Sequence, residues 1–187
     1  MPPKVRITKQ SITETALALA RESGESAINA RSVAAALGCS TQPVFSNFAT
    51  MDELKDAVIS AAYECYLGFI EREVKSEKYP KYKAFGMAYI RFAKEERELF
   101  KLLFMCDRSN KSLIPTTDFE QSVEMIMNAN GISKEKAEMM HLECWVCVHG
   151  IAAMLVTSFL EMDFELISNI VTDIYMGIRA RHLSEVK

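Results

Sequence analysis

The segment that most constrains the fold lies between Asn29 and Phe48, where signals that start and stop helices follow one another closely. Asn29 can cap a short helix that ends at Gly38. The Ser40 hydroxyl can cap a second helix, and Pro43 then falls in its first turn, where a missing backbone N–H breaks no hydrogen bond. We expect this second helix to end near Phe48. Two short helices joined by a glycine-containing turn are typical of a helix-turn-helix.

The second short helix begins with residue types that can read DNA. A helix that enters the DNA major groove must be short and must present its N-terminal end. At that end, side chains reach base edges and free backbone N–H groups reach phosphates. Ser40, Thr41 and Gln42 lie at that end. Gln can pair with adenine, and the Thr41 methyl or the Pro43 ring can contact a thymine methyl. The pattern favours a DNA-reading helix, although its spacing also fits short packing helices in a generic helical protein.

Helical signals continue over the rest of the chain. Thr50 and Glu53 have the spacing of a capping box that opens a helix extending to about Lys75. Apolar periodicity and breakers predict further helices over 8–23, 82–94, 95–105, 117–129, 134–161 and 164–182, with a loop over 107–115. Strand-like alternation is not found in the sequence, so we predict an all-α fold of about nine helices. We expect a helix-turn-helix domain over 1–50 and a second helical domain over 51–187, to which the family resemblance described below assigns effector binding and dimerisation.

Charge and cysteine usage limit the environment of the protein. Residues 1–50 carry five Lys/Arg and three Glu, a net charge of +2, whereas the whole chain carries -3. The basic part is therefore the part with the short helices, which suits a nucleic-acid partner. Five cysteines and an N-terminal segment without an apolar stretch predict reduced thiols and a cytoplasmic location. The longest apolar run, from Trp145 to Leu160, is shorter than the roughly 20 residues of a membrane span, so no membrane partner is expected.

Residues 12–54 resemble the TetR family of bacterial transcriptional regulators. The matching residues are Val33-Ala34, Leu37-Gly38-Cys39-Ser40, Val44-Phe45-x-Asn47-Phe48 and Glu53-Leu54. The resemblance is specific over about 45 residues, and the whole chain agrees in length and helix order. It implies a homodimer that binds a double-stranded DNA operator and whose C-terminal domain binds a small-molecule effector.

Three residues depart from the family pattern. Phe45 stands where a Tyr is usual, Asn47 where a His is usual, and Met51 where a helix-opening Lys is usual. These changes weaken or replace two or three backbone contacts, for which basic residues at positions 4, 6, 9, 31 and 55 can compensate. The residues expected to contact DNA are Arg31, Ser40, Thr41, Gln42, Pro43, Phe45, Ser46, Asn47 and Lys55.

A second, shorter resemblance concerns the C-terminal part. Trp145-x-x-x-His149-Gly150 resembles the Trp/His-Gly signature of one TetR ligand-binding subgroup. Trp145 and His149 are four residues apart on one helix face. Either Trp145 fills the core while His149 makes a buried hydrogen bond, or both line a ligand pocket. The candidate ligand-binding residues are Tyr66, Phe69, Phe92, Phe104, Met125, Trp145 and His149, which suit an apolar or aromatic effector.

A pair of cysteines and the usual catalytic motifs bear on other possible functions. Cys144 and Cys147 form a C-x-x-C, but they lie in a helical segment without a second cysteine pair, so no metal site is expected. Glycine-rich phosphate loops, nucleophile elbows and paired acid/base motifs are not found in the sequence, so we expect neither catalytic residues nor a cofactor. The alternative function is a regulator-like helical protein that acts through protein contacts, or through redox or metal sensing.

The last two predicted helices are apolar over wide faces. Small residues at Gly150, Ala152 and Ala153 face Ile167, Ile170, Val171, Ile174 and Ile178 in this pattern. Two such helices from each chain predict a homodimer through a four-helix interface. A two-fold dimer places two reading helices about one DNA turn apart, so the operator is expected to be a pseudo-palindrome. The sequence thus predicts a TetR-like regulator, a repressor that a small hydrophobic ligand releases from DNA.

Overall fold

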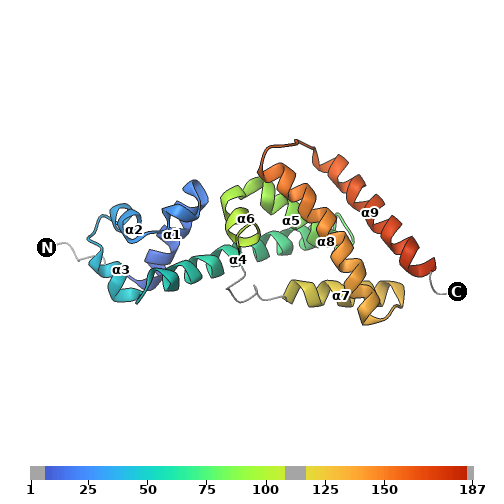
Figure 1. The fold of residues 1–187 in the computed structure, drawn as a ribbon, viewed down its shortest axis with the longest axis horizontal. Helices are drawn as coiled ribbons and strands as arrows, with labels where there is room; N and C mark the ends of the chain where they lie inside the picture. Colours follow the sequence, from blue (N-terminus) through green and yellow to red (C-terminus); the bar gives the residue numbers. More distant parts are fainter. Residues whose placement is uncertain (1–6, 108–116, 185–187) are drawn as a thin grey trace. The chain divides into compact units, whose positions relative to one another are not determined.

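The computed structural model describes residues 7–107 and 117–184, and this part of the chain is helical without strands (Figure 1). Its elements are α1 (Lys9–Ser23), a 3-10 helix (Glu25–Ala27), α2 (Ala30–Ala36), α3 (Gln42–Asn47), α4 (Met51–Lys75), α5 (Lys81–Glu95), α6 (Arg97–Phe104), α7 (Thr117–Asn130), α8 (Lys134–Val156) and α9 (Phe164–Ser184). The predicted all-α fold is confirmed. The expected loop over 107–115 and the basic residues Lys4 and Arg6 lie almost entirely outside the described residues.

The chain divides into two compact units. The N-terminal unit comprises Met1–Leu67 and Glu96–Cys106, and the C-terminal unit comprises Gly68–Glu95 and Asp107–Lys187. Helix α4 contributes to both units, and α6 belongs to the first although it follows α5 in the sequence. The functional division into residues 1–50 and 51–187 stays a prediction.

In the N-terminal unit, the first helix is fixed at both ends by local signals. The Thr8 hydroxyl accepts a hydrogen bond from the Ser11 backbone N–H, and the Ser11 hydroxyl accepts one from the Thr8 N–H. Gly24 ends α1 with φ +79°, a conformation that glycine adopts more readily than other residues. The core of this unit contains Ile12, Ala16, Ala20, Val33, Ala34, Val44, Phe48, Leu54, Val58, Ala62, Leu99, Phe100 and Leu103, all buried.

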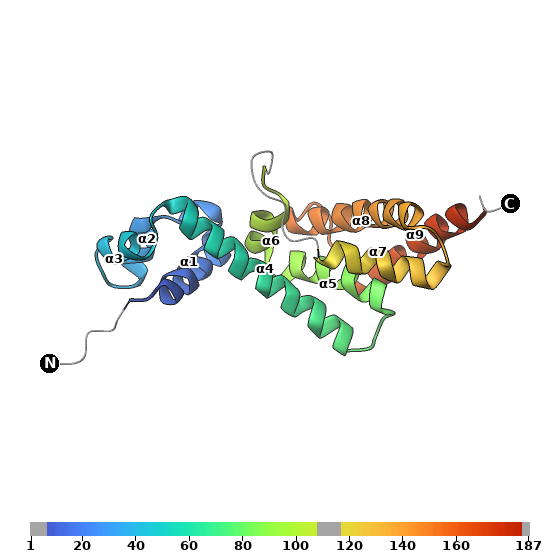
Figure 2. The same ribbon diagram turned by 90° about the horizontal axis from the view of Figure 1, so that it is seen from below.

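In the C-terminal unit, α8 is the central helix. It packs against α5, α7 and α9, and Figures 1 and 2 show α8 and α9 side by side. Its inner face buries Met140, Ile151, Ala152 and Leu155. Among the described residues, α8 is the one helix whose length and apolar composition would allow it to cross a membrane, a test that a core helix also passes. The packing of α8 against three other helices accounts for only part of that composition, because 33% of the apolar window is buried.

Several helix boundaries differ from those expected. The residue before α3 is Thr41, which has a helical conformation and makes no side-chain capping bond, so the predicted Ser40 cap is wrong. Helix α8 ends at Val156 rather than near residue 161, because Ser158 adopts a left-handed conformation with φ +55°. The Glu53 N–H donates to the Thr50 hydroxyl as predicted.

Candidate functional site

The turn between α2 and α3 is fixed by backbone hydrogen bonds. At the start of α2, the Asn29 side chain caps the helix by accepting a hydrogen bond from the Ser32 N–H at 2.9 Å, as predicted. At its end, the Cys39 N–H donates to the Ala34 carbonyl oxygen at 2.9 Å, which closes the last turn. Gly38 between them has φ +64°, and this left-handed conformation reverses the chain direction. These bonds set where α3 begins.

Helix α3 has one buried and one exposed side. Val44 and the following Phe48 are buried completely and attach the helix to the core of the N-terminal unit. Gln42, Phe45 and Ser46 face away from that core, and the Phe45 side chain is 54% exposed. More than half of the Phe45 surface therefore lies outside the packing of the unit. The helix therefore presents a mixed polar and aromatic surface on a well-anchored base.

The residues expected to contact DNA differ in how accessible they are. Arg31, Ser40, Gln42, Phe45 and Ser46 are exposed, whereas Thr41, Pro43, Asn47 and Lys55 are half-buried. Two of these side chains are bonded to their own helix. The Ser46 hydroxyl donates to the Gln42 carbonyl oxygen at 2.9 Å, and the Asn47 amide donates to the Pro43 carbonyl oxygen at 2.8 Å. Each keeps further hydrogen-bonding capacity, because an amide has a second N–H and a hydroxyl has a free lone pair.

Two lysines near α3 are paired with carboxylates. Lys9 lies 2.6 Å from Glu53 and 4.8 Å from the centre of the Phe48 ring. The hydrogen bond from Lys9 is the main reason why the pKa of Glu53 lies below its ordinary value. Lys55 lies 3.3 Å from Glu25. Each carboxylate offsets part of the positive charge that its lysine offers to a phosphate.

The candidate ligand-binding residues are found as separate aromatic pairs. Tyr66 and Phe104, both in the N-terminal unit, are in edge contact with ring centres 5.3 Å apart. Phe69 and Phe92, both in the C-terminal unit, form a similar pair at 5.2 Å, and Phe92 is fully buried. Met125 lies half-buried on α7. These residues supply apolar surface inside each unit.

Trp145 and His149 form a stacked pair on α8. Their ring centres are 5.1 Å apart and their planes differ by 23°. His149 Nδ1 lies 2.8 Å from the Tyr89 hydroxyl on α5, and burial lowers the pKa of His149. The indole of Trp145 is 41% exposed. The interpretation in which Trp145 fills the core of the chain is therefore wrong, whereas the hydrogen bond expected of His149 is present.

A second histidine cluster was missed in the sequence. His141 Nδ1 lies 3.0 Å from the Tyr82 hydroxyl, and its ring meets those of Phe119 and Tyr82 edge-on. Burial lowers the pKa of His141 to about 4 and raises the pKa of the neighbouring Cys144 thiol to about 11. Tyr82 lies next to the polar segment around Pro80, so the sequence did not indicate that its side chain points into the unit. A protonated, buried thiol is a poor nucleophile and a poor metal ligand.

The two cysteines of α8 are the residues at which a metal site was considered from the sequence. Cys144 and Cys147 are both free, and only the first is buried. Within 7–107 and 117–184, no group of three or more His, Cys, Asp or Glu is placed to hold a metal ion. Redox sensing by these two free cysteines stays a hypothesis.

The exposed apolar surface of the C-terminal unit differs from the one expected. Ala152, Ile167 and Val171, which were assigned to a dimer face, are buried inside the unit. The large apolar side chains that remain exposed on α8, on α9 and in the turn between them are Met139, Leu142, Trp145, Val146, Phe159, Leu160, Leu166 and Met176. We call these eight residues the α8–α9 apolar face. The periodicity of the sequence identified the helices but not which apolar side each one exposes.

These features define a class of all-helical protein in which two short helices joined by a tight turn precede a larger helical unit. Residues 82–168 match the family model "Tetracyclin repressor-like, C-terminal domain". The fold is similar to the crystal structure of a TetR-like transcriptional regulator from Rhodococcus sp. RHA1, with a TM-score of 0.64, 13% sequence identity and 98% of each chain covered. No curated protein matches the sequence. At this identity the structural likeness shows the fold alone, and the family match concerns residues 82–168.

Proposed function

We propose that this protein is a TetR-like, DNA-binding transcriptional regulator that acts as a repressor. The observation that carries the proposal is the two-sided α3, whose Val44 is fully buried while Gln42 and Ser46 face solvent. A reading helix needs this arrangement, because one side must be anchored while the other enters the major groove. The family match and the structural likeness support the same class.

Within this proposal, base contacts and phosphate contacts fall to different residues. Gln42 is exposed in the first turn of α3 and reads adenine, with Thr41 and Pro43 beside it. Arg31 on α2 and Lys55 on α4 contact phosphates. Phe45 cannot donate a hydrogen bond, so it contributes apolar contact with a sugar or a thymine methyl.

The C-terminal part dimerises through α8 and α9 and binds the effector. Dimerisation would remove from water the large exposed apolar side chains of the α8–α9 apolar face, which supports this part of the proposal. A two-fold dimer presents two copies of α3, which suits a pseudo-palindromic operator. The effector is apolar or aromatic, and the protein works in the cytoplasm with reduced cysteines.

The regulatory mechanism is a shift between two populations. The effector favours an arrangement of the two reading helices that no longer fits successive major grooves. Linkage requires the effector to bind free protein more tightly than operator-bound protein. Equal affinity for the two forms would exclude this mechanism.

Selection from random-sequence duplex DNA tests the proposal. The wild-type protein is expected to enrich a two-fold symmetric site, and Gln42→Ala is expected to relax preference at one position in each half-site. Gln10→Ala is the matched control, because Gln10 is also exposed and bonds only to Glu14 on α1. If folded, dimeric, ligand-free protein enriches no sequence at low salt, the proposal is wrong and the partner is not DNA.

A further inference from the structure

We infer that α5 and α9 form a binding site for a small molecule that carries a phosphate monoester. The site belongs to the C-terminal unit, and its ligand is distinct from both the operator and the apolar effector of the proposed function. The inference starts from the Lys83 ammonium on α5, which donates hydrogen bonds of 2.7 Å to the hydroxyls of Ser168 and Thr172 on α9. Lys83 and Ser168 are both half-buried.

The Lys83 ammonium has neutral partners and no counter-charge. Besides the two hydroxyls, it lies 4.9 Å from the centre of the Tyr79 ring. In the described part of the chain, no carboxylate forms an ion pair with it, whereas Arg91, two turns further along α5, pairs with Glu73 and Glu95. A cation that is partly removed from water is ordinarily paired with an anion. Lys83 therefore offers its charge to an anion from solution.

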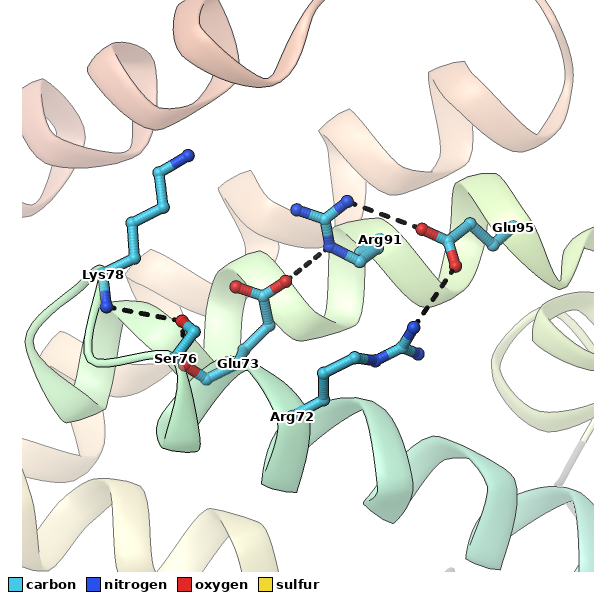
Figure 3. Close-up of polar contacts among 6 residues, drawn as sticks. All are labelled: Arg72, Glu73, Ser76, Lys78, Arg91 and Glu95. Carbon is cyan, nitrogen blue, oxygen red and sulfur yellow. Dashed lines mark hydrogen bonds and ion pairs between the residues drawn. The ribbon is translucent and has the colours of Figure 1, made fainter.

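A second ammonium lies beside the same aromatic ring. Lys78 Nζ is 5.2 Å from the centre of the Tyr79 ring, and in Figure 3 the Lys78 ammonium makes no ion pair with Glu73 or Glu95. Residues 72–94 carry seven Lys/Arg and two Glu, a net charge of +5, although the whole chain carries -3. Two ammonium groups in so basic a segment favour an anion with two negative charges.

The hydrogen-bond donors of the site suit a phosphoryl group. Two of the three N–H groups of Lys83 are used by the hydroxyls, so one remains. The Thr172 hydroxyl donates to the Ser168 carbonyl oxygen at 2.9 Å. The Ser168 hydroxyl accepts from Lys83, and its own O–H donates to no other described residue. A phosphate monoester offers three acceptor oxygens to these donors, whereas a carboxylate offers two.

The charge of the ligand separates a phosphate monoester from nucleic acid. A monoester carries between one and two negative charges at neutral pH, whereas each phosphodiester of a nucleic acid carries one. The half-buried Lys83 and Ser168 are also more accessible to a terminal phosphate than to a phosphate with a sugar on either side. The same two hydroxyls hold Lys83 in place before the ligand arrives, which lowers the entropy cost of binding.

Thermal unfolding of the full-length protein in the presence of small anions tests the inference. A ligand that binds the folded chain raises the unfolding midpoint in proportion to its affinity and concentration. The probes are inorganic phosphate, glycerol 3-phosphate and acetate, compared at constant ionic strength and at about pH 8, where the phosphates are dianions. We expect both phosphates to raise the midpoint relative to chloride, and acetate to leave it unchanged.

Three variants locate the bound phosphate. Lys83→Met keeps the apolar stem and removes the ammonium, so the dissociation constant for glycerol 3-phosphate should rise roughly 10-fold or more. Lys81→Met is the matched control, because it removes the same charge from an exposed residue two positions away, and it should change the constant less than about 2-fold. Ser168→Ala leaves every charge in place and should weaken binding by about 3-fold or more. This last variant keeps the test decisive if Lys83→Met fails to fold.

The outcomes also separate this inference from the proposed function. Equal stabilisation of wild type, Lys83→Met and Ser168→Ala by phosphate would place the bound anion elsewhere and overturn the inference. Acetate as effective as phosphate, or no effect of either phosphate, overturns it as well. Lys83→Met should bind a selected operator as the wild type does, and weaker binding would make nucleic acid the occupant. If no operator is selected but phosphate binding depends on Lys83 and Ser168, the inference stands and the proposed function fails.

Discussion

Arg91 on α5 donates a hydrogen bond from Nε to the carboxylate of Glu73, near the C-terminal end of α4, and Glu73 is buried (Figure 3). The same guanidinium lies 3.5 Å from Glu95 and 4.1 Å from the centre of the Phe164 ring at the start of α9. One side chain thus holds three helices of the C-terminal unit. The pairing matters because an unpaired carboxylate in that position would remain desolvated.

We predict that Arg91→Met lowers the free energy of unfolding by about 2 to 4 kcal/mol, because it leaves the Glu73 charge buried without a partner. Urea denaturation measures the change. Lys75→Met is the control, because Lys75 pairs with Glu71 on the surface, where such pairs contribute about 0.5 kcal/mol or less. The double variant Glu73→Gln/Arg91→Met should recover part of the loss. Equal losses for the Arg91 and Lys75 variants would show that Glu73 is solvated.

The ends of helices were readable from the sequence where a local signal decides them. Asn29 and Gly24 act within one turn of their own helix, so their roles follow from the residues beside them. The expected end of α8 was wrong because the apolar pattern continues through Phe159 and Leu160, although the backbone has already turned at Ser158. The spacing of apolar residues predicts which residues can be helical, but it does not predict at which residue the helix ends.

The candidate sites were predictable to different degrees for the same reason. The exposed side of α3 could be predicted, because it depends only on residues close to Gln42 in the sequence. The pairing of Glu73 with Arg91, and of Tyr82 with His141, depends on how separate helices pack, and helical spacing carries no information about that. Trp145 shows the remaining difficulty, because an apolar side chain that stays exposed has the same helical spacing as one that enters the core.

The low pKa of His141 predicts sensitivity to acid. Its pKa is about 4 in the folded chain and 6.5 ordinarily, so as the pH falls below 6.5 the unfolded chain takes up a proton before the folded chain does. The free energy of unfolding should therefore fall with pH between about 6.5 and 4 and should show no contribution from His141 above that range. With allowance for solvent screening, we expect a loss of about 1 kcal/mol between pH 7.5 and 5.

The comparison of wild type with His141→Gln isolates this contribution. Gln keeps a hydrogen-bond acceptor for the Tyr82 hydroxyl and does not titrate. Between pH 7.5 and pH 5 the urea midpoint of the wild type should fall further than that of the variant, because every other titrating group is common to the two. A constant difference between the two proteins would mean that His141 is hydrated and protonates normally in the folded state.

On the proposed function, Glu25→Gln should strengthen binding to the selected operator. The substitution removes the carboxylate 3.3 Å from Lys55 and leaves that lysine available for a phosphate. Freed from that pair, Lys55 should bind its phosphate more tightly, so the affinity at a fixed salt concentration should rise, and fluorescence anisotropy measures it. Glu14→Gln on α1 makes the same change of net charge without releasing Lys55, since Glu14 bonds to Gln10. Lys55→Met removes one phosphate contact and should flatten the dependence of log affinity on log salt by about 0.9. If Lys55→Met leaves the salt slope unchanged, Lys55 does not contact DNA.

Three glycine-to-alanine variants should differ in sign as well as size. Gly24 has φ +79° and ψ -176°, and a Cβ atom there would lie 2.9 Å from Glu98 Oε2, so Gly24→Ala should cost about 2 to 3 kcal/mol. Gly38 has φ +64° with open space around it, so Gly38→Ala should lower the free energy of unfolding by about 1 kcal/mol. Gly68 lies inside α4, also with open space around it, and its replacement should stabilise the protein by roughly 0.5 to 1 kcal/mol.

Thermal and urea midpoints of the three glycine variants give the order directly. The loss at Gly24 combines backbone strain with the displacement of Glu98, whose carboxylate also pairs with Lys101 at 2.6 Å. Adding Glu98→Ala to Gly24→Ala removes the clash but not the strain, so the double variant should recover only part of the loss. Full recovery would mean that the side chain of Glu98, rather than the conformation at the end of α1, makes glycine necessary there. If Gly24→Ala leaves the stability unchanged, the backbone after α1 can adopt another conformation that tolerates alanine.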